Sequence, residues 1–153
     1  MLKVAIVGFG TVGQAVARLL IGDEHKRLQL THIANRNIDR KKVDWIPSDV
    51  VWTDEMSPII ASDVDVVVEL IGGIDAAAEW IRASLMNGKS VVTANKQVIA
   101  DLGPELIVLA ERNGRNILFE AAVAGGVPVI RAVREGLAGD QLVGLLGILN
   151  GTC

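Results

Sequence analysis

A glycine-rich string near the amino terminus has the spacing G-x-G-x-x-G and consists of Gly8, Phe9, Gly10, Thr11, Val12 and Gly13. It follows the apolar run 3–7 and precedes apolar residues at helical spacing, so we predict that it joins a strand to a helix. There, Gly8 allows a tight turn, Gly10 lets the backbone approach a pyrophosphate, and Gly13 lets the helix pack closely. The free N–H groups of the helix would face the phosphates. The context favours dinucleotide binding over a tight turn without a ligand.

The residues after the next predicted strand, 28–34, bear on which dinucleotide binds. Such folds usually carry an acid here that accepts from the adenosine 2′-hydroxyl, but this chain has Arg36 and no acid before Asp39. A carboxylate would repel a 2′-phosphate, whereas a guanidinium can pair with it. We therefore predict NADP, with Arg36 as the main contact and Lys41 or Lys42 assisting. In the alternative, Arg36 stacks on the adenine and both NAD and NADP bind.

Two ionisable residues follow predicted strands at the edge of the sheet where ligands of open α/β folds bind. Lys96 comes after the predicted strand 90–93, and Glu120 ends the predicted strand 117–120. Both are expected in apolar surroundings, where lysines and carboxylates are rare unless paired. Their position favours a functional role over a purely structural one.

The elements that must position these residues alternate between strand and helix. Strands are predicted over 3–7, 28–34, 50–53, 64–70, 90–93, 117–120 and 142–149. Helices are predicted over 11–21, 54–62, 75–87, 104–113 and 127–137, with a short one within 38–50. Alternation at this spacing indicates right-handed crossovers and a parallel sheet. We predict a doubly wound α/β sheet of the Rossmann type, a single NAD(P)-binding domain over 1–153.

Composition excludes several classes of protein. The mean hydropathy is +0.40, but the apolar runs are shorter than the ~20 residues of a membrane-spanning helix and resemble strands buried on both faces. A net charge of −3 and 3% aromatic residues argue against nucleic-acid binding. The single cysteine, Cys153, excludes an internal disulfide. Without a secretory signal, the cytoplasm is the expected location.

Three further blocks stand out in the sequence, and the last two are far more specific than the glycine loop. They are Val-Thr-Ala-Asn-Lys at 92–96, Phe-Glu-Ala-Ala-Val-Ala-Gly-Gly-Val-Pro at 119–128 and Gly-Ile-Leu-Asn-Gly-Thr at 147–152. Together they resemble the successive signatures of homoserine dehydrogenases, and the resemblance extends over the whole chain. It implies an enzyme that interconverts L-homoserine and L-aspartate 4-semialdehyde with NAD(P), on the route to threonine and methionine.

The resemblance also implies roles for individual residues. Along the dinucleotide it places Phe9, Thr11 and Val12, and near the ribose or nicotinamide it places Gly72 and Gly73. Lys96 would lie beside the nicotinamide and the substrate oxygen, where an ammonium stabilises developing oxyanion charge. A sodium ion would be held, mostly through backbone oxygens, by Glu120, Val123, Gly125 and Val127. Gly151 and Thr152 would begin the pocket for the small-molecule substrate.

Members of this family continue past the Asn-Gly-Thr motif into a part that carries most substrate contacts, a second essential lysine and the dimer interface. The resemblance therefore implies that this chain is the cofactor domain of a homodimeric protein and is inactive alone. Two alternatives stay open. One is another NAD(P)-dependent amino-acid oxidoreductase, such as an aspartate or diaminopimelate dehydrogenase, which should lack the Thr-Ala-Asn-Lys and Asn-Gly-Thr signatures. The other is a non-catalytic module that senses NAD(P)H.

Overall fold

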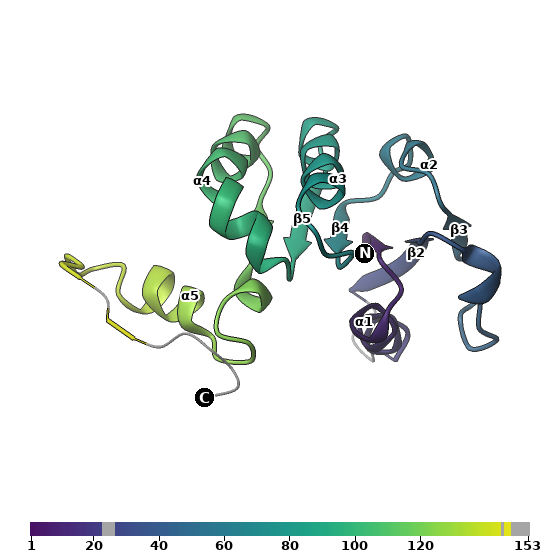
Figure 1. Cartoon of the computed structure of the whole chain (residues 1–153), viewed down its shortest axis with the longest axis horizontal. Coiled ribbons are helices and arrows are strands. Elements are labelled where there is room, and N and C mark those ends of the chain that lie inside the picture. Colours follow the sequence, from purple (N-terminus) through teal and green to yellow (C-terminus); the bar gives the residue numbers. More distant parts are fainter. Residues whose placement is uncertain (23–26, 145, 148–153) are drawn as a thin grey trace.

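A computed structural model describes residues 1–22, 27–144, 146 and 147 (Figure 1). The described residues form one six-stranded parallel sheet. Its strands are β1 (Leu2–Val7), β2 (Leu28–Ala34), β3 (Val51–Thr53), β4 (Val66–Glu69), β5 (Ser90–Thr93) and β6 (Ile117–Leu118). They lie in the order β3-β2-β1-β4-β5-β6, which is the doubly wound order with its reversal between β1 and β4. The predicted Rossmann-type fold class is confirmed.

Helices cover both faces of this sheet. In chain order they are α1 (Thr11–Ile21), η1 (Ile38–Arg40), α2 (Ser57–Ile60), α3 (Asp75–Met86), α4 (Lys96–Arg112), η2 (Glu120–Ala122), α5 (Val129–Arg131) and η3 (Ala132–Gly136). Figure 1 shows α1 on one side of the strands and α2, α3 and α4 on the other. The strands are apolar on both faces because both faces are covered. In β1, Ile6 packs with Ala17 of α1, whereas Val7 packs with Ile59 of α2 on the opposite side.

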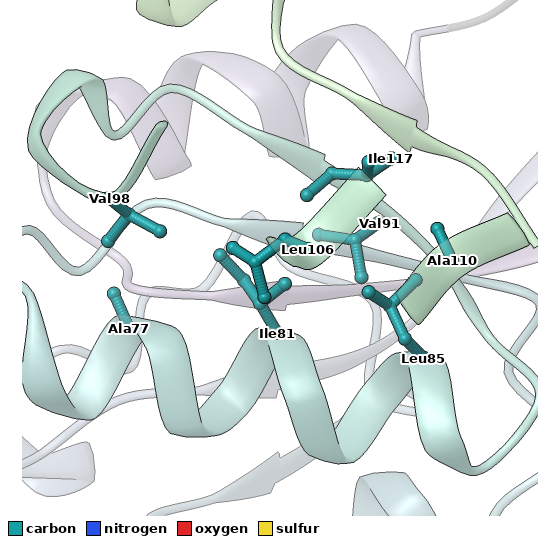
Figure 2. Packing of buried hydrophobic residues seen from close by; sticks show 8 residues of the cluster. All are labelled: Ala77, Ile81, Leu85, Val91, Val98, Leu106, Ala110 and Ile117. Carbon is teal, nitrogen blue, oxygen red and sulfur yellow. The ribbon is translucent and has the colours of Figure 1, made fainter. Parts of the chain in front are cut away.

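A hydrophobic cluster packs α3 and α4 against β5 and β6 (Figure 2). Strand β5 is the one that precedes Lys96. The cluster contains Ala77, Ile81, Leu85, Val91, Val98, Leu106, Ala110 and Ile117, all nearly or fully buried. Because α4 contributes residues near both of its ends, the helix is fixed along its length. The cluster therefore fixes the direction in which the start of α4 points.

Helix α4 starts earlier than predicted. The sequence pattern indicated a start at Pro104, but the helix runs from Lys96 and contains this proline. The side chain of Asn95 caps its first turn by accepting the Val98 N–H at 3.2 Å. Pro104 removes one internal hydrogen bond from the helix, and the buried residues Val98 and Leu106 on either side of it hold the helix together.

The chain beyond β6 also differs from the prediction. The predicted strand 117–120 ends at Leu118, and Glu120 already begins η2. The predicted helix 127–137 is present as the short α5 followed by the wider turns of η3. The strand predicted over 142–149 is absent from residues 142–144, 146 and 147, where Val143 is 96% exposed and has no neighbouring strand. The other residues of that prediction lie outside the described part of the chain.

None of the helices in the described ranges combines the length and the apolar character that crossing a bilayer requires.

Candidate functional site

The glycine loop has the shape that its spacing predicts. Gly8 has φ +104°, and a Cβ atom there would lie 2.7 Å from the carbonyl of Leu70. A Cβ atom on Gly13 would lie only 2.1 Å from the carbonyl oxygen of Gly8. These two glycines are therefore required by the turn and by the close approach of α1 to β1.

Gly10 differs from its two neighbours in the motif. Its φ of −86° is accessible to any residue, and a Cβ atom there would meet no described atom within 4 Å. Packing within the described protein therefore does not demand a glycine at this position. The bare backbone faces an open groove at the amino terminus of α1, which is the space that a pyrophosphate needs. The loop fits a dinucleotide.

Phe9 anchors this loop in the hydrophobic core. Its side chain is fully buried, and its ring packs edge-on against Trp52 with 5.0 Å between centroids. Its N–H donates to Oδ1 of Asn35 at 3.0 Å. The resemblance implied that Phe9 lies along the dinucleotide, but the structure places its ring in the core, because an apolar ring this size gains most by burial. Any contact with a cofactor would involve its backbone.

A cavity of 410 Å³ opens beside the loop, at the carboxyl ends of β1 and β2. Its lining includes Gly8, Gly10, Asn35, Arg36, Lys41 and Asp54. The structure thus brings Arg36 and Lys41 together, while Lys42 is not among the lining residues. Asp54 was missed in the sequence. It follows β3, and because Thr53 pairs with Ala34, the signal was its position just after the end of a neighbouring strand.

A second cavity, of 540 Å³, continues along the same edge of the sheet. Its lining includes Val12, Glu69, Gly72, Gly73, Asn95, Lys96 and Gly125. Leu70 and Gly72 line both cavities, so the two form one groove across the point where the strand order reverses. This is where ligands of such sheets bind. Below, the first cavity is called the adenosine half and the second the nicotinamide half.

Lys96 lies at the rim of the nicotinamide half. It is the first residue of α4 and is exposed, so the expectation of apolar surroundings was wrong. The physical reason is that the buried strand ends at Thr93 and Asn95 caps α4, so Lys96 lies in the first turn of a helix. Its ammonium can reach solvent and a bound ligand.

Glu120 and Val127, two of the four implied sodium ligands, accept hydrogen bonds within their own segment. The two carboxylate oxygens of Glu120 accept the N–H groups of Ile130 and Arg131, both at 2.9 Å, at the start of α5. The Glu120 carbonyl accepts the Val123 N–H at 3.1 Å, and the Val127 carbonyl accepts the Val129 N–H at 2.8 Å. The Glu120 carboxylate and the Val127 carbonyl are therefore engaged within the protein, and this arrangement gives the implied sodium ion no support. In the described ranges no three His, Cys, Asp or Glu side chains gather as a metal site either.

A buried polar network under the nicotinamide half escaped the sequence analysis. Glu69 is 0% exposed and accepts the Ile71 N–H at 2.8 Å and the Thr93 hydroxyl at 2.5 Å. Oγ1 of Thr93 accepts the Asn95 N–H at 3.0 Å, and the Asn95 side-chain amide donates to the Gly73 carbonyl at 2.5 Å. The network joins the two loops that line this half. Gly151 and Thr152, the predicted substrate residues, lie outside the described residues.

Comparison with known proteins gives consistent relatives. The family described as "Homoserine dehydrogenase, NAD binding domain" matches residues 8–120. The homoserine dehydrogenase of Corynebacterium glutamicum is 43% identical over 97% of this chain, which corresponds to 35% of its own length. That of Bacillus subtilis is 35% identical over 99% of this chain and 36% of its own length. The chain thus spans about a third of the length of the curated relatives it matches.

Solved structures show the same similarity. The crystal structure of a homoserine dehydrogenase from Thiobacillus denitrificans superposes with a TM-score of 0.81 at 35% identity, covering 91% of this chain and 34% of that one. A hyperthermophilic archaeal homoserine dehydrogenase in complex with NADPH gives a TM-score of 0.75 at 28% identity, covering 90% of this chain and 49% of that one.

Proposed function

Because the chain belongs to the family of homoserine dehydrogenase NAD-binding domains, we propose that it is the cofactor domain, over 1–153, of an oxidoreductase that interconverts L-homoserine and L-aspartate 4-semialdehyde. The observation that carries the proposal is the continuous groove that runs from bare Gly10 to Lys96 along the carboxyl edge of the sheet. The family match favours this function over an aspartate or diaminopimelate dehydrogenase. Most substrate contacts and a homodimer interface would lie elsewhere in the whole protein. A cytoplasmic location stays a prediction.

The residues of the groove would bind the cofactor in two parts. The amino terminus of α1 and the Gly10 backbone would hold the pyrophosphate, because the first N–H groups of a helix have no partner within it. Gly72 and Gly73 would lie against the nicotinamide half. A bound nicotinamide supplies the hydride acceptor or donor. Lys96 would bind the substrate oxygen and stabilise negative charge on it, a contribution typically worth about 3 kcal/mol.

We propose that NADP is the preferred cofactor and that NAD is the alternative. Arg36 and Lys41 both line the adenosine half, and two cations favour a 2′-phosphate over a hydroxyl. A similar archaeal homoserine dehydrogenase has a solved structure in complex with NADPH. Asp54 lines the same half and opposes this preference, which makes it a residue to test. The sodium ion implied by the resemblance finds no support in the arrangement of Glu120 and Val127 and has no part in the proposal.

Gly10→Ala tests the cofactor site. We expect the affinity for NADPH, measured by fluorescence titration, to fall about tenfold or more, because a Cβ atom would occupy the space of the pyrophosphate. The melting temperature should hardly change, since that Cβ atom meets no described atom within 4 Å. The matched control is Gly13→Ala, which should lower the melting temperature through its clash with the Gly8 carbonyl. Unchanged NADPH affinity in Gly10→Ala would contradict the proposed site.

The reaction itself is tested with the full-length protein that contains this domain. We expect NADPH-dependent reduction of L-aspartate 4-semialdehyde. Binding of NADPH without any turnover in that longer protein would favour the non-catalytic sensing module instead.

A further inference from the structure

We infer, on the basis of the function proposed above, that Glu69 is a positioning residue that holds both walls of the nicotinamide half through Thr93 and Asn95. The feature that prompts this is a carboxylate at the end of the central strand β4 that is 0% exposed yet belongs to the lining of the groove. Burial of a carboxylate is costly unless its oxygens are paired. An apolar residue would serve the sheet itself better.

The partners of Glu69 are neutral hydrogen-bond donors. One oxygen accepts a backbone N–H from Ile71, and the other accepts the hydroxyl of Thr93. None of the ion pairs found among the described residues includes Glu69. The carboxylate is therefore stabilised by the two loops that follow β4 and β5, and in turn it ties those loops to the sheet.

The first wall of the nicotinamide half follows β4. Gly72 and Gly73 lie consecutively in the left-handed region, with φ +71° and +74°. Two glycines in succession have little conformational preference of their own, so their path must be set from outside. Glu69 holds the residue before them at Ile71 N–H, and Asn95 holds the carbonyl of Gly73.

The second wall follows β5. The Thr93 hydroxyl donates to Glu69 and its oxygen accepts the Asn95 N–H, so one side chain passes the position of Glu69 on to Asn95. Asn95 then caps α4 through Val98. Lys96 is the next residue, so its place at the rim depends on this chain of bonds.

The strand register makes this relay possible. Glu69 pairs with Thr93 across β4 and β5, although the two are 24 residues apart in sequence. Paired residues of adjacent parallel strands project to the same side, so the carboxylate and hydroxyl meet directly. One buried carboxylate thereby controls the distance between the first wall, which contains Gly72 and Gly73, and the second wall, which leads to Lys96.

Thr93→Val tests the relay, because valine has the shape of threonine without the hydroxyl. We expect its affinity for NADPH to fall about tenfold, the scale of leaving buried polar groups unpaired. Affinity for 2′-phospho-ADP-ribose, which lacks only the nicotinamide ring, should stay close to that of the unchanged chain. The ratio of the two affinities is the decisive readout, because general destabilisation would weaken both ligands together. NADH and ADP-ribose make the same comparison if NADH binds more tightly.

Thr93→Ser is the matched control. It keeps the hydroxyl, so the ratio of the two affinities should equal that of the unchanged chain. Glu69→Gln should behave like Thr93→Val, because an amide NH₂ facing Thr93 leaves the threonine hydroxyl without its acceptor. An unchanged ratio in both Thr93→Val and Glu69→Gln, with normal NADPH binding by the unchanged chain, would overturn the positioning role alone. Absence of NADPH binding by the unchanged chain would instead overturn the proposed function.

Discussion

Two cations and a carboxylate share the adenosine half of the groove. Arg36 follows β2, Lys41 follows η1, and Asp54 follows β3. All three line the same cavity. A 2′-phosphate would gain from the first two and be repelled by the third, whereas a 2′-hydroxyl could donate to the carboxylate. The choice between NADP and NAD is therefore decided by individual side chains on a common scaffold.

Arg36→Gln separates these contributions. We expect the dissociation constant for NADPH to rise about 10- to 100-fold, the scale of a lost charge-assisted pair, while that for NADH changes little. Asp54→Asn should have the opposite effect and strengthen NADPH binding by removing a repulsive charge. Fluorescence titration of both cofactors provides the measurement.

Lys42→Gln is the control for this pair, because it removes a nearby charge that does not line the groove. Equal weakening of NADPH and NADH by Arg36→Gln would instead indicate that the guanidinium stacks on the adenine.

Among the elements, α4 links the core to the rim of the groove. Its buried residues Val98, Leu106 and Ala110 pack in the cluster of Figure 2, and its first residue is Lys96. The helix tolerates Pro104 in its interior because this packing outweighs the lost hydrogen bond. Pro104 itself is exposed, so it contributes little to the core.

Pro104→Ala should consequently stabilise the domain. An exposed helix interior favours alanine over proline by up to about 3 kcal/mol, and the loss of proline's restraint on the unfolded chain offsets about 0.4–1 kcal/mol of that gain. We expect urea unfolding to show a net increase of about 1–2 kcal/mol in the free energy of unfolding. Asp101→Ala, also exposed on α4, is the control and should change little. A loss of stability in Pro104→Ala would show that the helix is interrupted at this residue.

For the molecule as a whole, His32 and Lys89 are two groups with shifted pKa values that couple folding to pH. Burial lowers the pKa of His32 on β2, although Asp63 opposes the shift, and Lys89 and Lys3 add to it. Burial likewise lowers the pKa of Lys89, whose ammonium donates to the carbonyls of Ser62 and Val64 at 2.7 and 3.1 Å. Neither His32 nor Lys89 is among the residues that line the groove, so stability and cofactor binding can be examined separately.

Stability should decrease on acidification below about pH 6.5. Because the pKa of folded His32 lies below the ordinary value of about 6.5, the unfolded chain takes up the proton first, and stability is lost as the pH falls through this window. In His32→Gln the loss between pH 7 and about pH 5 should be smaller, as measured by urea unfolding at each pH. His25 is common to both chains, so its titration cancels in the difference. Identical pH profiles would show that His32 does not couple to folding.

Local patterns in the sequence were enough for most of the fold. The bounds of α1 and β2 agree with the predicted 11–21 and 28–34, because a glycine stop and an apolar period depend only on near neighbours. The roles of Gly8 and Gly13 could be predicted for the same reason, since the turn and the helix that it opens are contiguous.

Tertiary structure decided what depends on neighbouring strands. Asp54 joins Arg36 only through the pairing of β2 with β3, and Glu69 meets Thr93 only through the register of β4 with β5. The start of α4 depended on a competition between the Asn95 cap and Pro104, which the buried cluster settled in favour of the cap. Spacing along one segment carries no information on which residue of another strand will lie opposite, because that is set by packing of the whole sheet.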